Sequence, residues 1–270
     1  MESHFNADIA SASGRDVTFA VFSGGAKSLP STLFSVLLGN TLPATISVVF
    51  DRGRVCEDSF LWARVCDLAT ALNVPLKVIY TTKIGIRSNR DLLLANSPTP
   101  LVWMGDDDVV FLPSCLESYL SFLRRDFLFS GAFLAGTKVD VANLRGYADW
   151  SLSPRSYFPG TSPGDLNQIY HPGTPDSYTE YLDTGNCLIR RDRCASLGIQ
   201  FDLLRNSSPL GGEDTLFAKQ CLFKGASGHT CLEARSWHLE KPLPRFTADS
   251  YRQGVIESEF SRWLQIQSTQ

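Results

Sequence analysis

A short apolar run that ends in three consecutive carboxylates constrains the fold of this chain more than any other feature. Residues 101–104 are apolar, follow Pro100 and lead, after one glycine, to Asp106, Asp107 and Asp108. Such a run is typical of a buried strand, and strands of open α/β sheets deliver the residues after them to the edge where ligands bind. Because adjacent carboxylates repel one another, the stretch predicts a site that holds a divalent cation. A solvated acidic turn between two strands is the alternative.

The spacing of these carboxylates indicates which of them would bind the cation. Asp106 and Asp108 are two positions apart, so in extended backbone their side chains project to the same side. Carboxylate oxygens suit Mg²⁺ and Mn²⁺, which keep coordination positions open for phosphate oxygens. We therefore predict Mn²⁺ or Mg²⁺ as the cofactor.

The chain before this turn alternates between β-rich apolar runs and amphipathic runs. This alternation predicts an α/β fold with a largely parallel sheet and helices on both faces. Right-handed crossovers would bring the loops at 23–28, 51–54 and 105–108 to one edge of that sheet. We expect strands at 17–22, 44–50, 75–80 and 100–104, and helices at 29–38, 59–72 and 89–95.

The second half of the chain is less regular. Residues 147–181 are rich in Pro, Gly, Ser and aromatic residues; a long irregular segment of this kind is usually a functional loop or disordered. We interpret it as a lid over a substrate, with a mobile insertion as the alternative. Glu213 and Asp214 begin a predicted helix, where the helix dipole favours negative charge, so a simple N-cap explains either acid alone. Further elements are expected at 115–127, 129–140, 181–190, 191–197, 215–223 and 248–267, with a short strand before Trp237.

Composition excludes several classes of protein. The net charge of -3 argues against a general nucleic-acid binder, and no apolar run approaches the roughly 20 residues that span a bilayer. Residues 1–16 lack the apolar core of a signal peptide. The seven cysteines form no C-x-x-C motif, which argues against a zinc site and a disulfide framework. We expect free thiols in a reducing compartment, the cytoplasm, with peripheral membrane contact left open.

Five short motifs and one histidine follow one another in a characteristic order. They are Val49-Phe50-Asp51-Arg52-Gly53, Ser88-Asn89-Arg90, Gly105-Asp106-Asp107-Asp108, Thr184-Gly185-Asn186 with Leu188-Ile189-Arg190-Arg191, Gly212-Glu213-Asp214-Thr215-Leu216, and His238. In this order and spacing the chain resembles the family 2 type of glycosyltransferases with the GT-A fold, over roughly Val17 to His238. Asp91 stands where that family usually has Gly.

The resemblance implies an organisation and an activity. It implies a single Rossmann-like GT-A domain at 17–246 between a flexible leader (1–16) and a C-terminal helix (247–270). Within the domain, 17–111 would be the nucleotide-sugar half and 112–246 the acceptor half. The implied activity is metal-dependent transfer of a sugar from a nucleotide-sugar donor, most simply a UDP-sugar, to a hydroxyl of a saccharide, lipid-linked or small-molecule acceptor.

The resemblance also implies roles for single residues. Asp214 would be the general base of an inverting reaction, and Glu213 would orient it or bind the acceptor. The donor would contact Phe22, Ser23, Asp51, Asn89, Arg90, Asp106 and Asp107. The metal would be bound by Asp108, with Asp106 and His238. The acceptor would contact Thr184, Gly185 and Asn186.

Three other functions fit parts of the sequence. The loop at 23–30 weakly resembles the glycine-rich loop of sugar-phosphate nucleotidyltransferases, although one glycine and an arginine are missing. The pattern Asp106-x-Asp108-x-Val110 fits metal-dependent phosphatases, in which it normally follows the first strand. A nucleotide-sugar-binding protein without catalysis is the non-enzymatic alternative.

Overall fold

The structure of this chain is a computed structural model that describes residues 11–51, 59–82, 85–125, 131–140, 178–179, 182, 184–203, 213–226, 228–239 and 249–268. The segment 147–181, interpreted above as a lid or a mobile insertion, lies outside the described residues except for one two-residue strand. Within the expected leader, residues 14–16 form a short 3-10 turn that Ser13 caps, and Ala12 is buried.

The first half of the chain forms a four-stranded parallel unit connected by helices. Its strands lie in the order β3-β2-β1-β4, and each neighbouring pair is parallel. The predicted α/β alternation is therefore confirmed. The elements are β1 (Val17–Ser23), α2 (Leu29–Leu37), β2 (Thr45–Asp51), α3 (Ser59–Ala71), β3 (Leu76–Thr81), α4 (Ile86–Asn96) and β4 (Leu101–Asp106).

The second half extends the same sheet with both parallel and antiparallel pairs. The order continues from β4 through β8, β6 and β9 to β5, and β7 pairs with β9. Strands β6 and β9 run parallel, whereas the other pairs of this half are antiparallel. The elements are β5 (Val109–Phe111), α5 (Cys115–Arg125), β6 (Phe133–Asp140), β7 (Tyr178–Thr179), β8 (Asn186–Arg190), α7 (Arg191–Leu197), α8 (Glu213–Phe223), β9 (Gly228–His238) and α9 (Asp249–Ser268).

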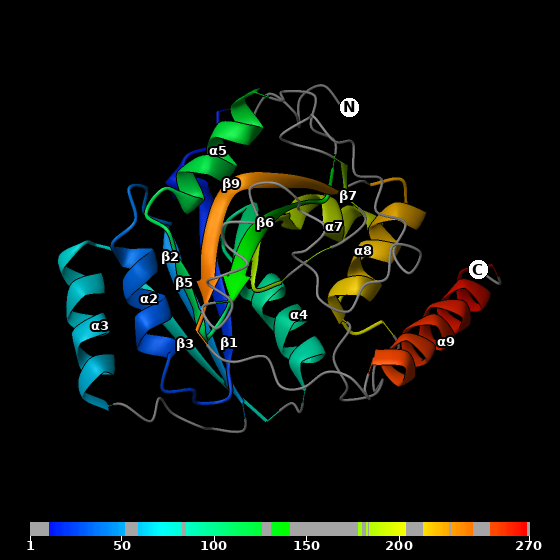
Figure 1. Cartoon of the computed structure of the whole chain (residues 1–270), viewed down its shortest axis with the longest axis horizontal. Coiled ribbons are helices and arrows are strands. Elements are labelled where there is room, and N and C mark those ends of the chain that lie inside the picture. The colour runs from blue at the N-terminus through cyan, green and yellow to red at the C-terminus, as the bar shows by residue number, and fades with distance from the viewer. Residues whose placement is uncertain are drawn as a thin grey trace.

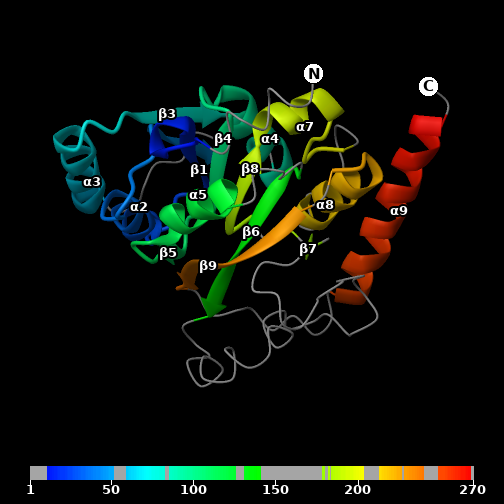
Figure 2. The same ribbon diagram turned by 90° about the horizontal axis from the view of Figure 1, so that it is seen from above.

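Two of the differences from the expected boundaries have a clear structural cause. Helix α4 begins three residues earlier than predicted, directly after Gly85, whose φ of 101° is a conformation that glycine adopts without strain. Strand β9 is much longer than the short strand expected before Trp237, because it pairs with β6 from its first to its last residue, with β7 at its start and with β5 at its end. In both views α3 and α9 lie at opposite ends of the molecule (Figures 1 and 2).

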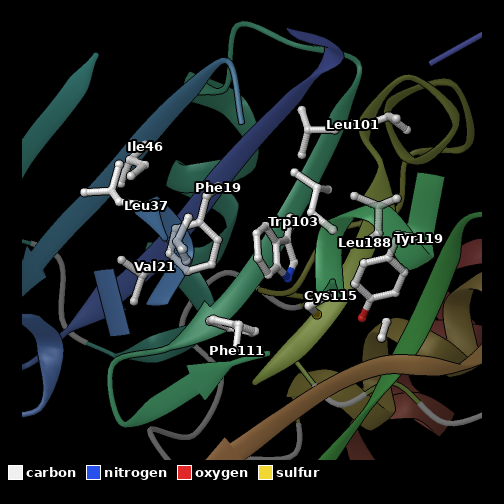
Figure 3. Packing of buried hydrophobic residues seen from close by; sticks show 14 of the residues in the cluster. Phe19, Val21, Leu37, Ile46, Leu101, Trp103, Phe111, Cys115, Tyr119 and Leu188 are labelled. Carbon is white, nitrogen blue, oxygen red and sulfur yellow. The ribbon is translucent and has the colours of Figure 1, made fainter. Parts of the chain in front are cut away.

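Alternating residues of the strands build a core on each face of the sheet. Phe19 and Trp103 face one core, which α2, α3 and α5 cover. Their neighbours Ala20 and Met104 face the other, which α4, α7 and α8 cover. In the first core the rings of Phe19, Trp103 and Phe111 pack edge to face, with centroids 4.7–5.5 Å apart (Figure 3). This packing holds the end of β4, and with it the acidic turn, in place.

The cysteines in the described part of the chain are free thiols. Six of the seven cysteines are described; all six are free, and five of them are buried. Burial raises the pKa of the Cys115 thiol and keeps it protonated. No helix in the described ranges is both long enough and apolar enough to cross a membrane.

Candidate active site

The acidic turn between β4 and β5 is tied to the loop after β1. Ser23 is buried, and its hydroxyl donates a 2.5 Å hydrogen bond to Oδ2 of Asp107. The same hydroxyl oxygen accepts hydrogen bonds from the backbone N–H groups of Gly25, at 3.0 Å, and Ala26, at 3.3 Å. Two residues that were predicted to contact the donor are therefore in direct contact, and together they fix the shape of both loops.

The carboxyl ends of the parallel strands lie along one edge of the sheet. Phe22 lies opposite Asp106 in the register of β1 and β4, and its half-buried ring packs against the core beside α4. Asp51 ends β2, two strands away from β4. The first loop and the acidic turn thus meet at one edge as expected, whereas residues 52–54 lie outside the described part of the chain.

Asp108 and His238 form a pair at the end of the sheet. Nε2 of His238 lies 2.9 Å from Oδ2 of Asp108, and the two side chains are 13% and 14% exposed. The backbone supports this contact, because β5 and β9 pair Val109 with His238 and the N–H of Leu239 donates to the carbonyl of Asp108 at 2.8 Å. Two of the three predicted metal ligands are therefore adjacent.

Their donor atoms fit a divalent cation only as part of a larger ligand set. Carboxylate oxygen and imidazole nitrogen suit Mn²⁺, and a cation between Asp108 and His238 would replace their direct contact. Among the described residues, no group of three His, Cys, Asp or Glu side chains is arranged to hold a metal ion. The remaining ligands would have to come from outside this pair, as when phosphate oxygens and water complete a magnesium or manganese site.

Arg90 is the buried centre of the site. It projects from α4, and its guanidinium group pairs with Oε1 of Glu213 at the start of α8 and, at 2.8 Å, with Oδ1 of Asp106. The ring of Phe201 lies 5.9 Å from the guanidinium carbon. Burial alone would lower the pKa of Arg90, but the charges of Glu213, Asp106 and Asp214 outweigh it and raise the pKa. Arg90 therefore stays charged and joins two acidic motifs that are far apart in sequence.

Asp106 has two cationic neighbours. Besides Arg90, Nζ of Lys138 on β6 lies 3.6 Å from Oδ2 of Asp106. Burial would raise the pKa of Asp106, but Lys138, Arg90 and His238 outweigh this effect and lower it. The partly exposed carboxylate therefore remains ionised. Sequence reasoning missed Lys138, because a single lysine in a predicted strand looks like a solvent-exposed residue.

The acidic pair of α8 is divided between two environments. Glu213 is buried; its Oε1 pairs with Arg90, while no described residue hydrogen-bonds its Oε2. Asp214 is partly exposed and accepts a 2.8 Å hydrogen bond from the N–H of Thr215. The two acids thus begin the helix as predicted, with Glu213 directed to Arg90 and Asp214 nearer to solvent.

Two further residues hold α4 in position. The carboxylate of Asp91 accepts hydrogen bonds from the backbone N–H groups of Phe201, at 2.7 Å, and Asp202, at 2.8 Å. Asp91 replaces the usual Gly of the family that the sequence resembles, and here it fixes the segment that carries the ring beside Arg90. Asn89 is fully buried and donates to the carbonyl of Gly85 at 2.8 Å. Its predicted contact with the donor stays a prediction.

Asn186 is a buried cross-link rather than a surface group. Its Oδ1 accepts hydrogen bonds from the hydroxyl of Tyr119, at 2.9 Å, and from the indole N–H of Trp103, at 3.4 Å. Its Nδ2 donates to the carbonyls of Thr137, at 3.2 Å, and Ala234, at 2.7 Å. These contacts engage both ends of the amide, and the predicted contact of Asn186 with the acceptor stays a prediction. Its neighbours Thr184 and Gly185 precede β8, beside the end of β4.

Replacing Gly136 with Ala is expected to destabilise the protein, because Gly136 lies directly against this cross-link. An added Cβ would lie 2.5 Å from Nδ2 of Asn186 and 2.6 Å from the carbonyl oxygen of Ala234. Overpacking of this kind costs about 1–3 kcal/mol, which urea unfolding would measure. Gly39→Ala is the matched control, since its Cβ meets nothing closer than 3.2 Å. Equal, small effects of both changes would contradict the assigned packing.

Comparisons with known proteins identify the fold. No protein-family model matches the sequence, and no curated protein is similar to it. A crystal structure of S. aureus TarS with UDP-GlcNAc has a TM-score of 0.60 at 13% identity, over 90% of this chain and 66% of the TarS chain. A second TarS structure has a TM-score of 0.58 at 14% identity, and the match covers 90% of this chain and 39% of the TarS chain. A crystal structure of GalNAc-T7 with UDP, GalNAc and Mn²⁺ has a TM-score of 0.57 at 12% identity, and the match covers 83% of this chain and 44% of the GalNAc-T7 chain.

The chain therefore has a GT-A-like glycosyltransferase fold. It spans less than two thirds of the length of each of these structures. At such low identity the likeness defines the fold alone, and membership of family 2 stays a prediction.

Proposed function

We propose that this protein is a metal-dependent glycosyltransferase that moves a sugar from a UDP-sugar to a hydroxyl acceptor. One observation carries the proposal. Arg90 joins Asp106 of the acidic turn to Glu213 of α8, at the edge of a GT-A-like sheet. Two acidic motifs that the resemblance assigns to donor and acceptor are thus held by one buried cation, as a reaction between the two substrates requires.

The donor would lie along the edge formed by the ends of β1, β2 and β4. Phe22, Ser23 and Asp51 would contact the nucleotide, and Asp107 would keep the first loop in shape through Ser23. Asp108 and His238, with Asp106 nearby, would hold Mn²⁺ or Mg²⁺. When bound, the cation would neutralise the negative charge that develops on the leaving diphosphate.

The acceptor would approach from the side of α8. Asp214 would accept the proton of the attacking hydroxyl, because it is the partly exposed acid of the pair. Glu213 would hold Arg90 in place and turn its second carboxylate oxygen towards the acceptor. Attack from the face opposite the leaving group would invert the configuration of the transferred sugar. Thr184 and Gly185, beside the end of β4, would line the acceptor site.

The other functions considered from the sequence have less support. The D-x-D-x-V pattern follows β4, not the first strand, which disfavours the phosphatase. The loop at 23–30 lacks one glycine and the arginine of the nucleotidyltransferase loop, which disfavours a sugar-phosphate nucleotidyltransferase. A catalytically inactive binding protein would bind UDP but transfer no sugar, so measurements of transfer separate it from an enzyme.

Asp108→Ala is expected to remove the metal-dependent part of UDP binding. The wild-type protein should bind UDP more tightly when Mn²⁺ is added, whereas the variant should bind UDP equally with and without Mn²⁺. Isothermal titration would measure both, and Asp67→Ala, an exposed acid on α3, is the matched control. A variant whose UDP affinity still rises with Mn²⁺ would exclude Asp108 as a ligand.

A further inference from the structure

Lys138 approaches the site from a strand that no sequence motif singled out. Its Nζ lies 3.6 Å from Oδ2 of Asp106, and its side chain is 19% exposed. The pairing of β6 with β9 shifts register between Ala135 and Thr137, and beyond this shift Lys138 lies opposite Ser236. Ser236 is two residues before His238 on β9, so β6 brings Lys138 to the same end of the sheet as Asp106 and His238.

Arg90 and Lys138, the two cations that contact Asp106, differ in how exposed they are and in how closely they approach carboxylates. The side chain of Arg90 is 6% exposed and lies between two carboxylates. Lys138 is the more exposed cation, and its 3.6 Å contact is longer than an ordinary hydrogen bond. An incoming diphosphate can therefore reach the ammonium group of Lys138 without separating the buried pair of Arg90 and Glu213.

We propose that Lys138 binds an oxygen of the donor's diphosphate. This inference rests on the proposed function and adds a second positive group to the donor site, beside the cation that Asp108 and His238 would hold. Asp106 would then act as a positioning residue, because its carboxylate contacts both Lys138 and Arg90. A lysine that serves only as a counterion of Asp106 is the competing explanation.

Binding of UDP and of uridine separates these two roles, because uridine lacks the diphosphate. In the presence of Mn²⁺, Lys138→Gln should weaken UDP binding roughly tenfold or more, the effect of losing a hydrogen bond to a charged group. Uridine, measured by displacement of UDP, should bind as it does to the wild type. Lys138→Arg should restore most of the UDP affinity, because it keeps the charge. Lys77→Gln is the matched control. Lys77 lies near the start of β3, at the end of the strand opposite the sheet edge where the donor would bind.

The outcomes also separate this inference from the proposed function. A wild-type protein that binds no UDP would overturn both. A wild type that binds UDP, together with a Lys138→Gln variant that binds it equally well, would overturn the role of Lys138 alone. A parallel loss of UDP and uridine binding would likewise overturn it, because the change would then have disturbed the site as a whole.

Discussion

Asp214→Asn is expected to slow sugar transfer at least about a hundredfold, the usual contribution of a general base, while leaving UDP affinity unchanged. The carboxylate of Asp214 can accept the proton of the attacking hydroxyl, whereas an amide cannot. Asparagine has nearly the same shape and is well tolerated near the start of a helix, so α8 and the pair of Glu213 with Arg90 should persist. Release of UDP from UDP-sugars would be measured with saccharide acceptors and with water.

A matched acid elsewhere makes this test specific. Asp192 also lies in the first turn of a helix, α7, and pairs with Arg190 at 3.3 Å. Asp192→Asn should transfer sugar at the wild-type rate. Full activity of Asp214→Asn would remove Asp214 as the base, and a loss of UDP binding in that variant would show that its role is not confined to the proton.

Arg90→Leu is expected to destabilise the folded protein by about 3–5 kcal/mol, the cost of leaving a buried charge without its partner, and to abolish UDP binding. The side chain of Glu213 is 6% exposed and pairs with Arg90, and Asp106 accepts from the same guanidinium. Both carboxylates would lose this partner. Urea unfolding at neutral pH measures the loss, and Arg64→Leu, an exposed arginine on α3, should have little effect.

The double variant Arg90→Leu/Glu213→Leu and the effect of pH test the same explanation. Removing both buried charges should recover part of the lost stability.

The pH dependence of stability gives a second test. Because the folded-state pKa of Asp106 is lowered, its contribution to wild-type stability is present above its unfolded pKa of about 3.9. This contribution disappears as the pH falls through the folded pKa. The stability difference between wild type and Arg90→Leu should therefore shrink at low pH. A difference that stays constant in acid would contradict the electrostatic explanation.

Local patterns predict the first half of the fold well. Each strand there is a short apolar run, each helix is amphipathic, and a right-handed crossover admits essentially one arrangement. The acidic turn therefore lies at the sheet edge, as expected for a run that ends in Asp106. The second half is harder to predict, because β6, β8 and β9 pair across long sequence separations and in both orientations.

The difference between local sequence patterns and long-range pairing also explains which site residues could be found from sequence. Asp108 and His238 have motif positions that suggest ligands, and the structure brings them together. Lys138 has no motif, and its place at the site depends on how β6 pairs with β9. Asn186 has a motif position, but the hydroxyl of Tyr119 and the carbonyl of Ala234 bind its amide in the interior. A sequence motif gives the residue type and order, whereas packing decides which atoms remain available to a ligand.

A thermal-shift measurement with UDP-, GDP-, CMP- and dTDP-sugars, each with and without Mn²⁺, tests most directly whether the sheet edge around Asp106 is a nucleotide-sugar site. A ligand at about a hundred times its Kd stabilises the folded state by roughly 2.7 kcal/mol, which raises the melting temperature by several degrees. We expect this shift with a UDP-sugar and only in the presence of Mn²⁺. No shift with any of the four, with or without the metal, would contradict the proposed glycosyltransferase function.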